Sequence, residues 1–200
     1  MSGAPVRELV LASGNAGKLR ELRSLLDGRG IEVRSQDEFG VPEVDETGLT
    51  FVENAILKAR QAAAHTGLPA VADDSGLEVD ALDGAPGIYS ARYAGPGASD
   101  EANVEKLLAE LGERPAQDRG ARFQCLLVFM RHHLDPVPLI CQGTWEGCIR
   151  TAPTGSNGFG YDPVFQVPEL DCSAAELDPQ TKNHLSHRGQ ALAKLLTRLP

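Results

Sequence analysis

Apolar positions in the first third of the chain form short continuous runs and longer stripes at helical spacing. Residues 9–12 are a continuous apolar run, which predicts a buried strand. Leucines then recur three and four positions apart between residues 19 and 26, which predicts an amphipathic helix ended by Gly28. A second short strand is predicted over residues 31–34. The chain therefore opens with a strand, a helix and a strand.

The middle of the chain continues this mixture of helical and extended patterns. Thr50 begins a capping-box pattern, which predicts a helix through about residue 66. The next expected elements are a strand over 70–72, turn-forming residues 73–76, a second strand over 77–79, an irregular Gly/Pro-rich stretch over 83–98 and a helix over 100–111.

The last third of the chain begins with two long β-patterned runs, 121–131 and 137–150, around a turn near Asp135. A glycine cluster follows over 155–163, and the chain closes with a capping-box pattern at Ser173 and a leucine-striped helix. Strands and helices mix without strict alternation, which favours an α/β fold with a mixed twisted central β-sheet flanked by helices. We expect one domain over residues 1–200, with two lobes around a substrate cleft.

Composition and charge narrow the class of protein. Two hundred residues with 42% apolar content are enough chain to bury a core. The formal net charge of -9 argues against binding a nucleic-acid polymer or an anionic membrane, because both favour basic patches. The sequence shows no signal-like segment and no apolar run of membrane-spanning length. Four cysteines without C-x-x-C spacing favour buried free thiols in a reducing cytoplasm over a zinc site or disulfides.

The first candidate chemistry lies between the first strand and the first helix, in Ser13-Gly14-Asn15-Ala16-Gly17-Lys18. A helix that starts at small residues directs free backbone N–H groups and a partial positive charge toward an anion, and Lys18 adds a full charge. This segment resembles a P-loop in its logic but lacks the G-x-x-x-x-G-K-[ST] spacing. Taken alone, it fits a phosphate site and an ordinary capped turn equally well.

Two acidic segments supply candidate metal ligands and a candidate base. Asp73-Asp74-Ser75-Gly76 follows a buried-looking strand, and ligands of open α/β sheets bind at strand ends. Carboxylates there coordinate Mg²⁺ or take a proton from water, but the same residue types also form solvated turns. The adjacent aspartates do not match the D-x-D of haloacid-dehalogenase phosphatases. The acidic run 43–48 either completes a metal site with Asp74 or is a solvated run.

Two later segments are rich in groups that recognise a planar ligand. Gly158-Phe159-Gly160-Tyr161-Asp162 places aromatic rings on a glycine frame, where a ring can stack on a base. Residues 182–188 concentrate hydrogen-bond donors near the start of the last helix. The competing interpretations are a core aromatic beside a turn and an exposed polar helix face.

In combination, the segments resemble the inosine triphosphate pyrophosphatase family, the dITP/XTP pyrophosphatases. The resemblance spans essentially the whole chain, and its six motifs stand in order at the family spacing. They are Ser13-Gly-Asn-x-x-Lys18, Glu46-Thr-Gly with Thr50-Phe-x-Glu-Asn-Ala, Ala72-Asp-Asp-Ser-Gly76, Gly84-x-Pro-Gly-x-Tyr-Ser-Ala-Arg92, Phe159-Gly-Tyr-Asp162 and Ser186-His-Arg188.

The resemblance implies Mg²⁺-dependent hydrolysis of ITP, dITP and XTP between the α and β phosphates, which removes deaminated purines from the nucleotide pool. It implies Asp74 as general base and as a ligand of Mg²⁺ together with Asp45 or Glu46. The implied substrate contacts are Ser13, Gly14, Asn15, Ala16, Gly17 and Lys18 for the triphosphate, Ser75, then Phe159, Gly160, Tyr161 and Asp162 around the base, and Lys182, His187 and Arg188 at its edge. A homodimer is also expected from the family.

Base selection follows from donor and acceptor logic. Hypoxanthine and xanthine carry an acceptor oxygen at C6, where adenine carries an amino donor. Donors such as Arg188 facing that edge pair with the oxygen and are left unpaired by adenine, and a site built on hydrogen bonds rejects such a mismatch strongly. Two rivals are a Maf-type pyrophosphatase acting on modified or pyrimidine nucleotides and a nucleotide-sensing module without catalysis.

Overall fold

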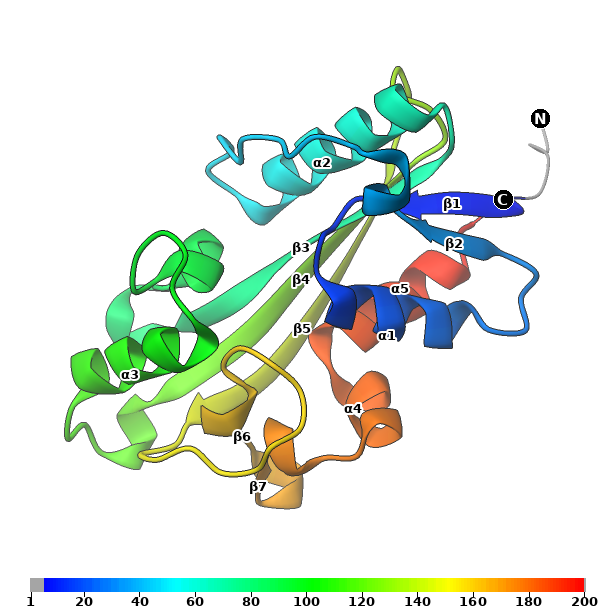
Figure 1. Cartoon of the computed structure of the whole chain (residues 1–200). Coiled ribbons are helices and arrows are strands. Elements are labelled where there is room, and N and C mark those ends of the chain that lie inside the picture. Colours follow the sequence, from blue (N-terminus) through cyan, green and yellow to red (C-terminus); the bar gives the residue numbers. More distant parts are fainter. Residues whose placement is uncertain (1–5, 200) are drawn as a thin grey trace. The chain divides into compact units, whose positions relative to one another are not determined.

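The computed structural model describes residues 6–199, which form an α/β fold (Figure 1). Its strands are β1 (Glu8–Leu11), β2 (Glu32–Ser35), β3 (Ala70–Val79), β4 (Gly120–Met130), β5 (Leu139–Ile149), β6 (Phe165–Val167) and β7 (Cys172–Ser173). Its α-helices are α1 (Ala16–Leu26), α2 (Phe51–Thr66), α3 (Asp100–Leu111), α4 (Pro179–Leu185) and α5 (His187–Leu196).

The strands form one seven-stranded sheet in the order β2-β1-β3-β4-β5-β6-β7. β1 pairs in parallel with both β2 and β3, whereas β6 pairs antiparallel with β5 and β7. The predicted mixed sheet with flanking helices is therefore confirmed. The described residues divide into two compact units: the first holds residues 6–74, Cys125–Gln142 and residues 190–199, and the second holds Ser75–Gln124 and Gly143–Gly189.

β1 lies between two helical layers of the first unit. Its alternate side chains enter two different apolar clusters, Leu9 and Leu11 on one face and Val10 on the other. Leucines of α1 and α5 complete the first cluster, and alanines of α2 complete the second, so helices cover both faces of β1 (Figure 1). A parallel strand covered on both faces needs an apolar side chain at every position, which explains the continuous apolar run.

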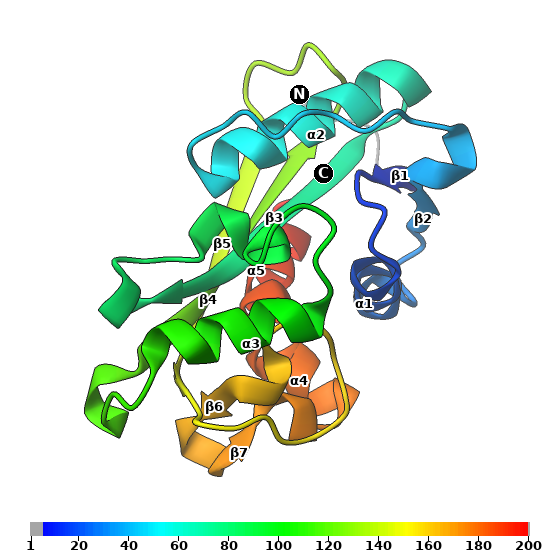
Figure 2. The same ribbon diagram turned by 60° about the vertical axis from the view of Figure 1, so that its left-hand side comes forward.

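The second unit has its own core, which is rich in aromatic rings. The apolar face of α3 packs here, and α3 lies beside the 3₁₀ segment Gly87–Arg92 (Figure 2). Phe165 is fully buried, and its ring centroid lies 4.5 Å from that of Phe123 and 5.1 Å from that of Trp145. Tilted ring pairs at such distances add stabilisation beyond the buried area.

One sequence prediction of secondary structure is wrong. Residues 70–79 form the single strand β3, not two strands around a solvated turn, so Asp73 and Asp74 lie within a strand. Both carboxylates are ion-paired with lysines, which removes their need for solvent. At the other end of the chain, the capping box at Ser173 is confirmed but opens only a one-turn 3₁₀ segment. Asp178 caps α4, and the extended residue Ser186 separates α4 from α5.

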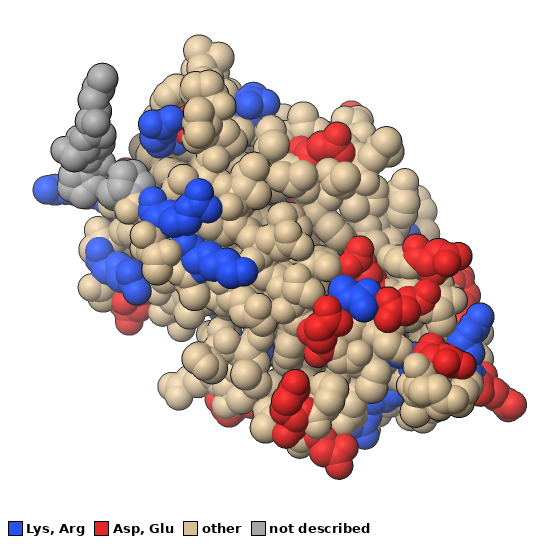
Figure 3. Space-filling model, turned by 180° about the vertical axis from the view of Figure 1, so that it is seen from behind, with Lys and Arg blue, Asp and Glu red and all other residues tan. Residues whose placement is uncertain are grey.

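Charged side chains are unevenly distributed over the surface. On the face shown in Figure 3, most Lys and Arg side chains gather on one part, and Asp and Glu side chains crowd another. No helix among the described residues combines the length and apolar character needed to cross a membrane. The four cysteines are free, and Cys125 and Cys141 are buried.

The predicted turn between β4 and β5 is held by Asp135, and we expect this carboxylate to stabilise the fold in a pH-dependent way. Asp135 is 2% exposed and accepts hydrogen bonds from the Arg131 guanidinium and from the backbone N–H groups of Arg131 and Val137. The Arg131 hydrogen bond, more than any other contact, lowers the pKa of Asp135 well below its usual range. A lowered folded-state pKa gives stability that is complete above the unfolded-state pKa of about 3.9 and is lost as the pH falls.

Asp135→Asn should therefore reduce the free energy of unfolding at pH 7 by about 1–2 kcal/mol, a range that allows for the solvent-exposed Arg131 side chain. Urea denaturation of wild type and variant at pH 7 and pH 3 measures this, and the difference should shrink at pH 3. Asp27→Asn, at an exposed position, is the matched control. A difference of equal size at both pH values would contradict the assignment.

Candidate functional site

The predicted site residues fall into two groups, one in each compact unit. The first unit holds the segment 13–18, the acidic pair Asp45-Glu46, and Asp74. The second holds Ser75, the segment 159–162 and the donors of residues 182–188.

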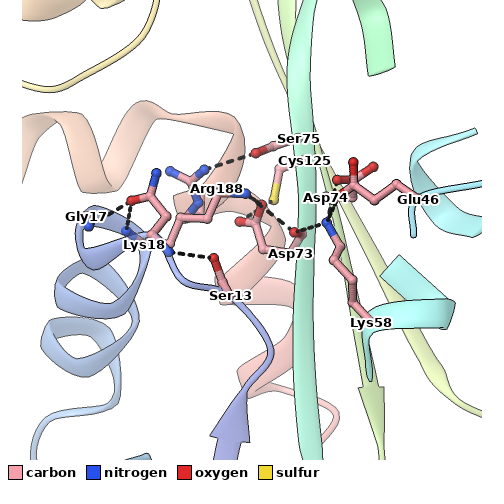
Figure 4. A network of polar contacts seen from close by, with 11 residues as sticks. Ser13, Gly17, Lys18, Glu46, Lys58, Asp73, Asp74, Ser75, Cys125 and Arg188 are labelled. Carbon is pink, nitrogen blue, oxygen red and sulfur yellow. Dashed lines mark hydrogen bonds and ion pairs between the residues drawn. The ribbon is translucent and has the colours of Figure 1, made fainter. Parts of the chain in front are cut away.

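The segment 13–18 forms the capped turn that opens α1 (Figure 4). Asn15 is the N-cap, and its Oδ1 accepts the backbone N–H groups of Gly17 at 2.8 Å and Lys18 at 3.1 Å. The N–H of Asn15 itself donates to Ser13 Oγ at 3.2 Å. The expectation of free N–H groups at this helix start is thus wrong for these three residues, because the turn satisfies them internally. The charge that this turn offers to an anion is the Lys18 ammonium.

Lys18 lies against Asp73, 55 positions away in the sequence. Its Nζ is 2.7 Å from Asp73 Oδ1 and 3.4 Å from the Asp73 carbonyl oxygen. The Asp73 carboxylate is 2% exposed and also accepts a hydrogen bond from the Cys125 thiol at 3.5 Å. Asp73 therefore fixes the position of the Lys18 ammonium (Figure 4).

A second lysine, Lys58 of α2, links Glu46 and Asp74, two of the three carboxylates that were predicted as metal ligands. Its Nζ donates to Asp74 Oδ1 at 2.6 Å, to Glu46 Oε1 at 2.9 Å and to the Asp73 carbonyl oxygen at 3.0 Å (Figure 4). Burial alone would lower the pKa of Lys58. The charges and hydrogen bonds of the Asp74 and Glu46 carboxylates outweigh burial and raise this pKa above its ordinary value. Burial raises the pKa of Asp74, and the opposing attraction of Lys58 reduces that rise.

Sequence reasoning missed Lys58, although a signal existed. The position lies three residues after Ala55 and four before Ala62, on the face of α2 that carries buried alanines. A lysine on the buried face of a helix needs a partner, and here the partners are carboxylates.

The segment that carries Glu46 is held against the start of α2. Asn54 Oδ1 accepts the N–H of Gly48 at 2.8 Å, and Glu53 Oε2 accepts the N–H of Leu49 at 2.9 Å. A Cβ on Gly48 would lie 2.5 Å from Glu53 Cβ, so only glycine fits this approach. Glu46 thereby reaches the Lys58 ammonium, whereas the side chain of its neighbour Asp45 is exposed.

In the second unit, the guanidinium of Arg188 donates to the hydroxyl of Ser75 at 3.1 Å (Figure 4). Arg188 is buried near the start of α5, and Ser75 is half-buried in β3. The carbon at the centre of the guanidinium lies 5.5 Å from the centroid of the Phe159 ring. The structure thus brings together Ser75, Phe159 and Arg188 as three of the predicted contacts.

Lys182 and Asp162 form a buried ion pair beside the same ring. Lys182 Nζ is 2.6 Å from Asp162 Oδ2 and 5.1 Å from the Phe159 centroid. Burial raises the pKa of Asp162, and Lys182 opposes this rise. The Phe159 N–H donates to the same carboxylate oxygen at 2.8 Å. Asp162 therefore holds both the Lys182 ammonium and the backbone of the aromatic segment. The Lys182 ammonium and the Arg188 guanidinium thus both lie within cation–π distance of the Phe159 ring.

His187 occupies an aromatic stack. Its ring lies 4.8 Å from that of Phe123 at an interplanar angle of 12°, and 6.5 Å from that of Trp145. It is 6% exposed. Tyr161 is also buried, and its hydroxyl donates to the Ser90 carbonyl oxygen at 2.8 Å. These two predicted contacts therefore lie in the core of the second unit.

The fold is that of an α/β protein with two polar clusters, one of lysines and carboxylates in the first unit and one around the Phe159 ring in the second. The chain belongs to the Ham1 family, whose model matches residues 9–198. A dITP/XTP pyrophosphatase of Thioalkalivibrio sulfidiphilus is 62% identical over 192 residues, covering 96% of this chain and 98% of the relative.

Solved structures agree with this assignment. A HAM1 protein from Coxiella burnetii is 55% identical with a TM-score of 0.90, covering 96% of this chain and 98% of its own. The Ham1 protein of Staphylococcus aureus is 45% identical with a TM-score of 0.85, covering 96% and 97%. The resemblance drawn from the six sequence motifs is thereby confirmed.

Proposed function

We propose that this protein hydrolyses ITP, dITP and XTP to the nucleoside monophosphate and pyrophosphate, and so removes deaminated purines from the nucleotide pool. The name of the relative that is 62% identical over nearly the whole chain supports this reaction. The observation that carries the proposal in the structure is the convergence of Lys18 and Lys58 on Asp73, next to the Asp74 carboxylate.

The two lysines supply the positive charge that a triphosphate needs. Phosphoryl transfer requires alignment and charge neutralisation more than covalent chemistry by the protein. Both ammonium groups are held by the Asp73 carbonyl oxygen, at 3.4 and 3.0 Å, so their spacing is set before substrate arrives. Charges fixed in this way need little reorganisation during the reaction. In this protein the segment 13–18 then binds the triphosphate chiefly through Lys18.

The donor set around Lys58 fits Mg²⁺. Magnesium is usually bound through one or two carboxylates together with water and substrate phosphates, so a cluster of three protein carboxylates is not required. Asp74 and Glu46 already converge on one cation, the Lys58 ammonium, at 2.6 and 2.9 Å. We assign these two as the metal-holding pair, in preference to the exposed Asp45. When bound, Mg²⁺ would neutralise phosphate charge and acidify a bound water.

Asp74 is the proposed general base. Its burial raises its pKa, which makes the carboxylate a better proton acceptor, and its pairing with Lys58 keeps it ionised. It takes a proton from the water that attacks the α-phosphorus, and pyrophosphate leaves.

The residues around Phe159 in the second unit are proposed to bind the base. Phe159 stacks on the purine, and the Asp162–Lys182 pair with Arg188 presents donors to the C6 oxygen of hypoxanthine or xanthine. Adenine offers an amino group at that position and leaves those donors unsatisfied. Ser75, held by Arg188, is proposed to contact the substrate as well. A homodimer, a cytoplasmic location and the absence of nucleic-acid or membrane partners complete the proposal.

Pyrophosphate release from ITP, XTP, dITP, GTP and ATP, and from a panel of pyrimidine and modified triphosphates, measured with and without Mg²⁺, tests this function. We expect rapid Mg²⁺-dependent release from the first three and kcat/KM at least about 100-fold lower for ATP. Preferred turnover of modified or pyrimidine nucleotides would support a Maf-type activity instead. Nucleotide binding without pyrophosphate release from any of them would support a sensing module.

A further inference from the structure

The peptide planes on both sides of Phe159 are each held by a carboxylate. The N–H of Phe159 donates to Asp162 Oδ2 at 2.8 Å, and the N–H of Gly160 donates to Asp100 Oδ2 at 2.7 Å. Because each peptide unit is planar, two fixed planes determine the direction of the Cα–Cβ bond between them. The direction in which the Phe159 side chain leaves the backbone therefore depends on both carboxylates.

Left without these contacts, the segment would have considerable backbone freedom. Gly155, Gly158 and Gly160 all adopt positive φ, at 81°, 79° and 62°. Glycine loses the most conformational freedom on folding, so ordering this segment requires several anchors. The space is also tight, since a Cβ on Gly158 would lie 2.0 Å from Asp162 Oδ2.

Asp100 comes from a rigid element 60 positions away from Gly160. It is the first residue of α3, next to the N-cap Ser99, whose hydroxyl accepts the N–H of Ala102 at 3.2 Å. Asn103, on the first turn of the same helix, binds the N–H of Ala94 at 2.8 Å and the carbonyl oxygen of Ala91 at 3.3 Å. The leucines of α3 pack in the second-unit core. The backbone that carries the Asp100 carboxylate is therefore fixed in position.

We propose that Asp100 is a positioning residue for base recognition, which acts by fixing the Phe159–Gly160 peptide and thus the direction in which the Phe159 side chain leaves the backbone. This inference rests on the proposed function, in which Phe159 stacks on the purine. Asp100 thereby helps to keep the Phe159 ring beside the two cations, with Lys182 Nζ at 5.1 Å and Arg188 Cζ at 5.5 Å from the ring centroid. It contributes to affinity for the base and leaves both the triphosphate contacts and the chemical step unchanged.

The test compares Asp100→Ala with Asp100→Asn and with Glu101→Ala in the full chain. Glu101 is the matched control, because it is the other acidic residue in the first turn of α3, is exposed, and contributes to the same helix dipole. Asp100→Ala should raise KM for ITP about tenfold with kcat within about twofold, as expected for the loss of a charge-assisted hydrogen bond. Asp100→Asn, which keeps an acceptor oxygen, should recover part of that loss.

Competitive inhibition separates base binding from phosphate binding. Asp100→Ala should weaken inhibition by IMP about as much as it raises KM, and should leave inhibition by inorganic tripolyphosphate unchanged. Equal weakening of both inhibitors, or a KM equal to that of wild type, would overturn the proposal. An equal effect of Glu101→Ala would assign the change to the helix rather than to the Gly160 contact. Wild-type protein without turnover of any nucleotide would instead refute the proposed function, a result distinct from these.

Discussion

Replacing Asp74 by asparagine should lower kcat for ITP hydrolysis by about 10³-fold or more while leaving the fold intact. The substitution removes the proposed base and one of two carboxylates proposed to hold Mg²⁺, and general-base catalysis alone contributes about 10²- to 10⁴-fold. The fold should persist because Lys58 keeps its ion pair with Glu46 at 2.9 Å and its hydrogen bond to the Asp73 carbonyl oxygen. The buried ammonium is therefore not left without a partner, the situation that makes removal of one member of an ion pair costly.

Pyrophosphate release under saturating ITP and Mg²⁺ measures this effect, with circular dichroism and thermal unfolding as checks on the fold. Asp27→Asn, the same substitution at an exposed position on the first unit, is the matched control and should retain wild-type kcat. An Asp74→Asn protein that is folded and hydrolyses ITP within about tenfold of wild type would remove Asp74 from the role of base.

The fold follows closely from patterns that are local in sequence. The apolar run of β1, the leucine stripe of α1 and the capping-box pattern at Thr50 each predict the element that forms, because burial and capping act within a few residues. β3 is the instructive exception. Four turn-forming residues in a row predict a turn, yet they continue the strand because Lys18 and Lys58 neutralise the two aspartates from distant parts of the chain. Local propensity contains no information about those lysines.

Contacts between residues that are distant in the sequence also explain which residues of the candidate site the sequence did not predict. Glu46, Asp74 and Arg188 lie in motifs whose residue types suggest their chemistry. Asp100, by contrast, looks like an ordinary first-turn acid of α3, and its contact with Gly160 exists only after the two segments fold together. The Asn15 cap shows the converse: the sequence identifies the turn, but only the geometry reveals that the cap already uses the N–H groups of Gly17 and Lys18.

Arg188→Ala should reduce the preference for ITP over ATP, whereas Lys18→Ala should weaken turnover of both nucleotides alike. Arg188 lies over the Phe159 ring and is proposed to recognise the C6 oxygen, so its loss removes a contact that only deaminated purines make. Lys18 is held by Asp73 and is proposed to bind phosphates, which every triphosphate shares. We expect the ratio of kcat/KM for ITP to that for ATP to fall about tenfold or more in Arg188→Ala and to change less than about twofold in Lys18→Ala.

Because Arg188 is buried and holds Ser75, the alanine variant is paired with Arg188→Lys, which keeps the charge but loses the planar fork of donors. An intermediate ITP-to-ATP ratio in Arg188→Lys would show that donor geometry, and not charge alone, selects the base. Arg20→Ala, at an exposed position on α1, is the control for loss of a cation and should leave both rate constants unchanged. The same ITP-to-ATP ratio in Arg188→Ala and Lys18→Ala would contradict the division between base recognition and phosphate binding. Loss of a base contact changes this ratio, whereas loss of a phosphate contact lowers kcat/KM for both nucleotides equally.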